Sequence, residues 1–352
     1  MPVIEIDGSV GEGGGQILRT SITLASVLGK RIRISKIRAG RKQPGLRPQH
    51  LQAVLAATKI SGGDVHGASV GSTEIEFSPA KIPKRYAGVI DTGTAGSIPL
   101  IAQTIIPISI FGGVELDVEI VGGTEVPNSP SFDYLSRIVV PVYSRLGGRI
   151  DLGLKRRGYY PRGGGSVILR SSKIREPASF ELDATMQQDG VNVLSVSRSL
   201  PPHVAQRQAD IAMKKIETEK LKVNRVEIDS AGDSLSPGSS ILVYTGDLTT
   251  KFVGATSLGE RGKRAELVGE DAANNFLEEE KTHPAVDSHL ADMLVTLLSL
   301  VPGRSSFTTS FLTDHFSTNC LVAEKLTGCK VKTEKSGALW HVEIVGLPEK
   351  PN

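Results

Sequence analysis

Cysteine and long apolar segments are scarce in this sequence. Its two cysteines, Cys320 and Cys329, lie in one segment and have no second Cys/His pair at zinc spacing, which argues against a disulfide framework or a zinc site. The first residues lack a basic segment followed by an apolar core, so no secretion signal is expected. No run approaches the roughly 18 apolar residues of a membrane span. We therefore expect a cytoplasmic protein from a reducing compartment, with no membrane partner.

An excess of charge of either sign is also absent. The chain of 352 residues carries 41 Lys+Arg and 38 Asp+Glu residues, so only local clusters of basic residues are informative about nucleic acid. Several catalytic motifs are missing: the KxDG of the common nucleotidyl transferases, the metal motifs HxHxH and HExxH, and the GxxxxGK(S/T) phosphate loop. Without that lysine nucleophile, a covalently bound nucleotide would be carried by a histidine.

The chain repeats its own pattern at an interval of 84 residues, from Asp7 to Asp91 and from Gly29 to Gly113. Each copy contains a strand, a turn of small residues, a helix, a second strand and a second helix. That second helix ends at a Gly-Gly pair and is followed by two alternating strands. The pattern predicts a repeated β-α-β-α-β-β unit.

A third copy starts at Ala178 and breaks off, and its first helix resumes only at Asp287. The interval holds a strand, a helix, three strands and a helix, which indicates an inserted domain, because interruption at a surface loop is well tolerated. We predict an α+β fold in which three β-α-β-α-β-β units form a large domain of residues 1–182 and 282–352. A smaller α+β domain is inserted at residues 183–281.

The candidate for covalent chemistry is His315, in the polar segment Thr313–Asn319. We place it at the end of a strand, ahead of Ser317, Thr318 and Asn319 as helix N-caps, where backbone N–H groups and the positive helix end favour anions. A nucleophile that attacks a phosphate would fit there. The alternative is an ordinary hydrogen-bonded histidine in a polar turn.

Two further loops supply candidates for phosphate and metal binding. Gly11–Gln16 stands between a strand and a helix, so its backbone can approach a phosphate, and Glu12 offers an oxygen ligand for Mg²⁺ or Mn²⁺. The alternative is a flexible tight turn. Arg38 and Arg41 flank a glycine, with Arg19 on the preceding helix, and together they indicate a site for a polyanion such as an RNA end. The alternative is a solvated basic loop.

The segment Arg157–Gly165 is the least expected part of the chain. Its three consecutive glycines before a strand cost backbone entropy, so close packing or close backbone approach must require them. Tyr159 and Tyr160 more often cover a core than stack on bases. We interpret this segment as structural first.

These segments together resemble one family, the RNA 3'-terminal phosphate cyclases. The resemblance extends from Ile4 to about Val345 and rests on six motifs in the same order. The motifs are DG-x-x-GEGGGQILR (Asp7–Arg19), RAGR-x-x-PGL (Arg38–Leu46), QT-x-x-P (Gln103–Pro107), RG-x-x-PRGGG (Arg157–Gly165), HLAD (His289–Asp292) and H-x-x-TN (His315–Asn319). The resemblance implies three repeated units and an inserted domain with thioredoxin-like elements.

The resemblance also implies a reaction, the ATP-dependent conversion of an RNA 3'-terminal phosphate to a 2',3'-cyclic phosphate. His315 would attack the α-phosphate of ATP and become a histidine-AMP. The AMP would pass to the RNA phosphate, giving RNA(3')pp(5')A, and the neighbouring 2'-hydroxyl would then close the ring and expel AMP. A covalent intermediate divides one difficult step into easier ones.

The family's functional positions carry over to this sequence residue by residue. The resemblance implies ATP-binding positions at Gln103, Pro130, His289, Leu290, Ala291, Asp292 and Met293. It implies a metal ligand at Glu12 and phosphate-binding arginines, for ATP or RNA, at Arg19, Arg38 and Arg41. Met293 stands where a glutamine is common and His289 where some members have tyrosine, differences that bear on nucleotide preference and base stacking.

Two other functions remain open from the sequence. A catalytically silent branch of the same family acts in ribosome assembly as a protein- and RNA-interaction factor, and that branch lacks the histidine nucleophile. An enolpyruvyl transferase would share the repeat architecture, although architecture alone does not decide function.

An exposed sheet edge would also let two chains pair into a homodimer.

Overall fold

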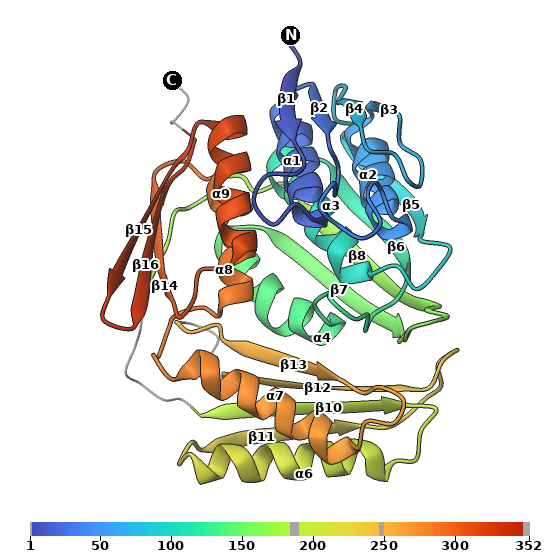
Figure 1. Cartoon of the computed structure of the whole chain (residues 1–352), viewed down its shortest axis with the longest axis vertical. Coiled ribbons are helices and arrows are strands. Elements are labelled where there is room, and N and C mark those ends of the chain that lie inside the picture. The colour runs from blue at the N-terminus through green and yellow to red at the C-terminus, as the bar shows by residue number, and fades with distance from the viewer. Residues whose placement is uncertain (1, 184–189, 246–249, 348–352) are drawn as a thin grey trace.

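The structure is a computed structural model that describes residues 2–183, 190–245 and 250–347. Three of its four sheets share one strand order. The fourth is formed by residues that in sequence separate the first strand of the third unit from its first helix, and it lies at the lower end of the molecule in Figure 1. In each of the three equivalent sheets the first two strands are parallel and the remaining pairs are antiparallel. The predicted α+β fold with three repeated units is confirmed.

The first unit runs without interruption and has the strand order β1-β2-β4-β3. Its elements are β1 (Ile4–Asp7), α1 (Gly15–Leu28), β2 (Ile32–Ser35), α2 (Pro48–Ser61), β3 (Asp64–His66) and β4 (Ile75–Ser78). Helix α1 ends at Gly29 in the left-handed conformation, with φ 66°. The equivalent Gly113 ends the first helix of the next unit with φ 90°, so the repeated glycine has the same backbone role twice.

The second unit has the order β5-β6-β8-β7, and its second helix is divided by a π-helical turn. Its elements are β5 (Arg85–Asp91), α3 (Ile98–Gly112), β6 (Glu115–Gly122), α4 (Phe132–Tyr134), the π-helical turn (Leu135–Val139), α5 (Val140–Arg145), β7 (Arg149–Arg156) and β8 (Gly165–Ser172).

The third unit is split, as predicted, with its first strand far from its first helix in sequence. Its elements are β9 (Glu181–Leu182), α8 (Ser288–Leu298), β14 (Arg304–Thr309), α9 (Asp314–Thr327), β15 (Lys330–Ser336) and β16 (Leu339–Val345). Short β9 pairs in parallel with β14, which completes the order β9-β14-β16-β15.

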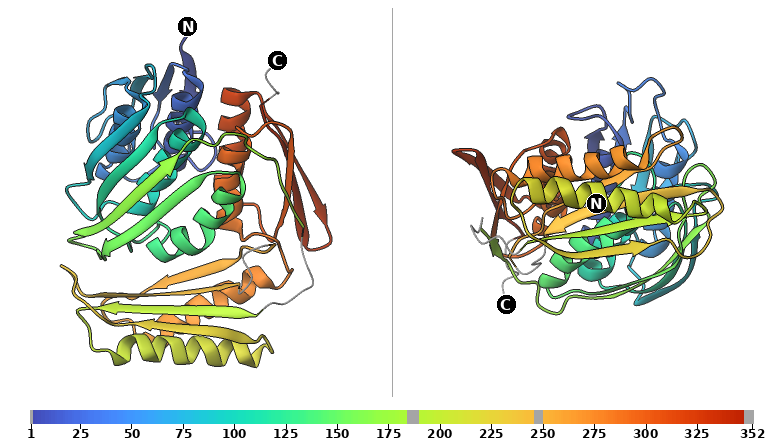
Figure 2. Two further views of the ribbon diagram at one scale, coloured as in Figure 1. Left: turned by 180° about the vertical axis from the view of Figure 1, so that it is seen from behind. Right: turned by 90° about the horizontal axis from the view of Figure 1, so that it is seen from below.

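The inserted segment forms a sheet of order β11-β10-β12-β13 with two helices against it. Its elements are β10 (Val191–Arg198), α6 (His203–Thr218), β11 (Val223–Asp229), β12 (Gly238–Thr245), β13 (Gly254–Leu258) and α7 (Ala265–Glu280). Figure 2 shows this layer beside the three-unit body from two further directions. The predicted boundaries at 183 and 281 stay a prediction, and 184–189, next to the first of them, lie outside the described residues.

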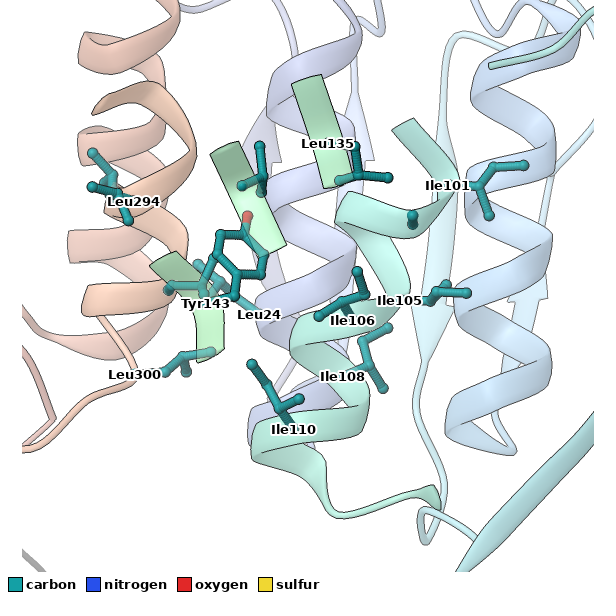
Figure 3. Close-up of a cluster of buried hydrophobic side chains, with 14 of the residues drawn as sticks. Leu24, Ile101, Ile105, Ile106, Ile108, Ile110, Leu135, Tyr143, Leu294 and Leu300 are labelled. Carbon is teal, nitrogen blue, oxygen red and sulfur yellow. The ribbon is translucent and has the colours of Figure 1, made fainter. Parts of the chain in front are cut away.

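Two separate hydrophobic cores follow from this arrangement. The larger one joins all three units, because α1 packs against α2, α3 and α9, and α8 packs against α9. Figure 3 shows part of it, where Leu24 of α1, Ile106 of α3 and Tyr143 of α5 gather, each at most 1% exposed. Burying such a side chain contributes about 1.5–3 kcal/mol. The inserted layer has a second cluster around Phe276, between its sheet and its two helices, while Leu194, Val196, Leu242 and Tyr244 of the same sheet belong to the larger cluster.

Within the described residues, no helix combines the length and apolar character needed to cross a membrane.

Candidate active site

His315 lies in the first turn of α9, and this corrects the local prediction. The N-cap is Thr313, whose side-chain oxygen accepts a hydrogen bond from the Phe316 amide at 3.0 Å. Ser317, Thr318 and Asn319, predicted as N-caps, are therefore helical residues. The helix begins earlier because the strand β14 already ends at Thr309 and a threonine just before Asp314 satisfies a free amide. The positive helix end still lies beside the imidazole.

A cavity of about 700 Å³ opens between the three-unit body and the inserted layer. His315 contributes to its wall, together with residues from α1, α3 and α8. Of the residues predicted from the sequence, the lining includes Arg19, Gln103, Pro130, His289, Asp292, Met293 and His315. The structure thus brings together side chains from four helices and one loop that are up to three hundred residues apart.

Not all predicted residues lie on that wall. Leu290 and Ala291 are fully buried in the larger hydrophobic core. Glu12, Arg38 and Arg41 are not part of the lining. Arg38 donates to the carbonyl oxygens of Gln43 and Gly45 at 2.8 and 3.0 Å and so stabilises its own loop.

Arg19 presents a positive charge that no carboxylate of the described residues balances. Its guanidinium donates to Gln16 Oε1, and among the described residues no Asp or Glu pairs with it. Burial lowers the pKa of Arg19 to about 10, which still leaves it charged at neutral pH. A partly enclosed cation of this kind is stabilised by an anion that enters the cavity.

Glu12 lies between Arg41 and His315. Its Oε1 forms an ion pair with Arg41, and its Oε2 is 3.7 Å from Nδ1 of His315. Both Oε2 and Nδ1 are buried without a hydrogen-bond partner among the described residues. Burial, Arg19, His289 and Arg41 lower the pKa of His315, so its imidazole is neutral and nucleophilic at neutral pH.

A network behind the cavity wall joins α8, α9 and α1. Thr313 donates to Asp292 Oδ1 at 2.7 Å, and Asn319 donates from Nδ2 to the Asp292 carbonyl oxygen at 2.7 Å. Asn319 in turn accepts from Thr20 of α1 at 2.7 Å. Burial raises the pKa of Asp292 to about 7, partly offset by the hydrogen bond from Thr313. The side chains that fix the start of α9 therefore also hold Asp292 at the cavity.

Sequence reasoning missed the part of the wall that the inserted layer supplies. Asn275, Glu278 and Glu279 of α7 and Thr256 of β13 also line the cavity. Glu279 accepts hydrogen bonds from the amide and hydroxyl of Ser288 at the start of α8, but none of these four residues belongs to a motif, so the sequence did not mark them. Asn128 and Ser129 also line the cavity, and the sequence could have indicated them because they adjoin the predicted Pro130.

Known proteins match this chain over most of its length. A family model described as RNA 3'-terminal phosphate cyclase matches residues 10–333. The chain is 46% identical over 331 residues to the RNA 3'-terminal phosphate cyclase of Sulfolobus acidocaldarius, covering 93% of this chain and 96% of that one. It is 42% identical over 350 residues to that of Thermococcus kodakarensis, with 98% and 100% covered. To that of Pyrobaculum aerophilum it is 39% identical over 344 residues, with 98% of both covered.

These matches define an enzyme of the ligase class. The chain belongs to the RNA 3'-terminal phosphate cyclase family. A solved structure, the enolpyruvyl transferase NikO from Streptomyces tendae, aligns with 97% of this chain and 48% of that one, at 8% identity and a TM-score of 0.35, too low to support an argument.

Proposed function

We propose that this enzyme uses ATP to convert an RNA 3'-terminal phosphate into a 2',3'-cyclic phosphate, through a histidine-AMP at His315 and an RNA(3')pp(5')A intermediate. The observation that carries the proposal is the placement of His315. Its neutral imidazole stands at a helix N-terminus on the wall of a cavity that also contains the unbalanced charge of Arg19.

In the first step a ring nitrogen of His315 attacks the α-phosphorus of ATP. The N–P bond forms as the bond to the bridging oxygen breaks, and pyrophosphate leaves. Because Nδ1 faces Glu12 at 3.7 Å, we assign the attack to Nε2, with Glu12 orienting the ring. The positive charge of Arg19 would stabilise the charge that develops on the phosphate oxygens.

In the second step an oxygen of the RNA 3'-phosphate attacks the phosphorus of the histidine-AMP, which breaks the N–P bond and regenerates His315. In the third step the 2'-hydroxyl attacks the 3'-phosphorus, loses its proton and expels AMP. The phosphoanhydride supplies the good leaving group that a phosphomonoester lacks. The hydroxyl is already held beside the phosphorus, and such proximity supplies roughly 7 kcal/mol or more.

The remaining cavity residues fit the binding of the nucleotide. Gln103 and Met293 lie next to each other, with Gln103 Nε2 3.4 Å from Met293 Sδ, and His289 and Pro130 line the same space. We assign Pro130 and His289 to the base and Asp292 to the phosphate end, because Asp292 is held beside the start of α9. Leu290 and Ala291 would act through their backbone and packing, as both side chains are buried in the core.

A divalent metal fits at Glu12 as one ligand of an incomplete set. Glu12 Oε2 is a buried oxygen without a hydrogen-bond partner, as a metal-binding carboxylate would be, although Arg41 occupies Oε1. Within the described residues no group of three His, Cys, Asp or Glu side chains could hold a metal ion. The other ligands of Mg²⁺ or Mn²⁺ would then be phosphate oxygens and water, and the ion would neutralise phosphate charge.

We assign Arg19 and Arg41 to the phosphates of ATP or RNA, and Arg38 to the same site through the loop that it stabilises. Arginine binds phosphate with two parallel hydrogen bonds, and this makes RNA binding sensitive to salt.

The test of the proposal is incubation with ATP and Mg²⁺ or Mn²⁺, followed by intact mass measurement. We expect an increase of one AMP per chain that acid removes, since a phosphoramidate is acid-labile, and release of pyrophosphate. His315→Ala should show neither. An oligoribonucleotide with a 3'-phosphate should yield a cyclic end, and the same oligomer with a 3'-hydroxyl should not. Labelling that persists in His315→Ala would mean that another residue is the nucleophile.

The catalytically silent alternative is not favoured, because His315 is present and the curated relatives are named as cyclases. A cytoplasmic location and a homodimer stay predictions. Light scattering of the purified protein would decide the second.

A further inference from the structure

The segment Arg157–Gly165, which the proposed reaction does not use, lies beneath the loop 126–130 that lines the cavity. Asn128, Ser129 and Pro130 of this loop contribute to the wall, so the position of the loop determines the shape of the nucleotide site. The loop has little support of its own. Within the described residues its internal hydrogen bonds all come from Ser129, whose amide and hydroxyl donate to the Val126 carbonyl oxygen at 3.3 and 3.1 Å and whose hydroxyl also lies 3.3 Å from the Pro130 carbonyl oxygen.

Arg157 holds both ends of this loop. Its guanidinium donates to Glu125 Oε1 at 2.6 Å on one side, and to Asp133 Oδ2 and Oδ1 at 2.8 and 2.9 Å on the other. All three residues are at most 5% exposed. Burial raises the pKa of Glu125 to about 7, although the charge of Arg157 acts in the opposite direction. Only arginine has the planar fork that can reach two carboxylates at once.

The backbone next to Arg157 also binds the residues just before the loop 126–130. Gly158 accepts from the Thr124 amide at 2.8 Å and donates to the Thr124 hydroxyl at 2.9 Å. A Cβ at Gly158 would lie 2.2 Å from the Gly165 nitrogen and 2.5 Å from the Gly122 oxygen, so no side chain fits there. Gly158 and Gly165 therefore allow three backbone segments, at Gly122, Gly158 and Gly165, to meet closely.

The far end of the segment contacts the inserted layer. The Arg162 amide donates to Ser236 Oγ at 3.2 Å, and a Cβ at Gly238 would lie 2.1 Å from the ring of Tyr159. The other end of the loop also reaches this layer, because Ser131 Oγ lies 3.3 Å from Thr256 Oγ1 of β13. The loop is thus held between Arg157 below and the inserted layer beside it.

We infer that Arg157, together with Glu125 and Asp133, positions the loop 126–130 and thereby sets the affinity of the cavity for its nucleotide. Arg157 is a positioning residue, since it touches the loop ends and not the cavity. The inference rests on the proposed function for the identity of the nucleotide, ATP, but not for the position of the loop.

The first experiment measures amide hydrogen exchange of the ligand-free protein. Arg157→Lys keeps the positive charge between the two carboxylates but lacks the planar fork that makes two bonds to Asp133 and one to Glu125 together. We therefore expect exchange in 126–131 to rise by about tenfold or more, with α9 unchanged. The control is Arg207→Lys, which changes the two-bond pair of Arg207 with Glu266 on the inserted layer and should leave 126–131 unchanged. If Arg157→Lys fails to fold, Glu125→Gln replaces it.

The second experiment measures adenylylation kinetics. We expect Arg157→Lys to raise the KM for ATP by about tenfold while kcat at saturating ATP changes less than about threefold. Pro130→Ala should raise the KM for ATP in the wild-type protein. In the Arg157→Lys protein it should raise the KM little further, because the displaced loop has already lost the contact of Pro130 with the nucleotide. A general loss of stability would instead lower the active fraction and leave KM unchanged.

Unchanged exchange in 126–131, or fully additive effects of the two substitutions on KM, would overturn the inference. If the wild-type protein forms no AMP adduct, the proposed function fails while the exchange experiment still decides the role of Arg157.

Discussion

Thr313 connects the stability of α9 to the ionisation of Asp292, and its replacement by valine tests both at once. The side chain accepts from the Phe316 amide at 3.0 Å and donates to Asp292 Oδ1 at 2.7 Å. Loss of an N-cap costs about 1 kcal/mol. Loss of a hydrogen bond costs about 0.5–1.5 kcal/mol when the carboxyl is neutral and about 1.5–3 kcal/mol when it is ionised.

The effect of Thr313→Val should therefore depend on pH. Burial raises the pKa of Asp292 to about 7, so the carboxyl is protonated in the folded protein at pH 5 and ionised at pH 8. A carboxyl with a raised pKa binds its proton more tightly in the folded state, so its contribution to stability falls as the pH rises from the unfolded pKa through about 7. We expect Thr313→Val to cost about 2 kcal/mol at pH 5 and about 3 kcal/mol at pH 8.

Reversible unfolding in guanidinium chloride at the two pH values measures this difference. Thr313→Ser keeps both hydrogen bonds and serves as the matched control, with an expected change below about 1 kcal/mol. Equal destabilisation by valine at both pH values would refute the coupling of Thr313 to Asp292. Equal destabilisation by serine and valine would refute the role of the hydroxyl altogether.

Three further predictions follow from the geometry. Arg41→Gln removes a cation that lowers the pKa of His315, so this pKa should rise. In a pH–rate profile the acid limb of the adenylylation rate should therefore move to higher pH. A shift to lower pH would contradict this. Tyr134→Phe removes the hydroxyl that donates to Asp287 at 2.7 Å. It should lower the free energy of unfolding, measured by chemical denaturation, by about 2 kcal/mol. An unchanged free energy of unfolding would mean that the buried carboxyl finds another partner. Leu24→Ala opens a cavity in the core of Figure 3 and should cost about 3 kcal/mol by the same measurement, with activity at low temperature retained.

Local sequence rules predicted the elements well but not their limits. The repeated Gly29 and Gly113 marked helix ends because a left-handed residue is needed there, whatever surrounds it. The strand predicted ahead of His315 ends at Thr309, and α9 begins at Asp314, ahead of the predicted N-caps Ser317, Thr318 and Asn319. These limits depend on where a partner strand stops, and a single sequence does not contain that information.

The sequence indicated only part of the candidate site. His315, Arg19 and Gln103 are candidates that the motifs supplied, and the structure places all three on one cavity. Glu12 was predicted as a metal ligand, whereas its ion pair with Arg41 and its proximity to His315 became visible only in three dimensions.

The sequence by itself determined the three repeated units and the interruption of the third, and it supplied the candidate residues for phosphate chemistry, because periodicity, glycine positions and side-chain type are local properties of the chain. Only the tertiary structure decided that the inserted layer supplies part of the cavity wall. It also decided that Arg157 reaches both ends of the loop 126–130. These contacts join residues far apart in sequence, and they form only when helices and sheets pack against one another.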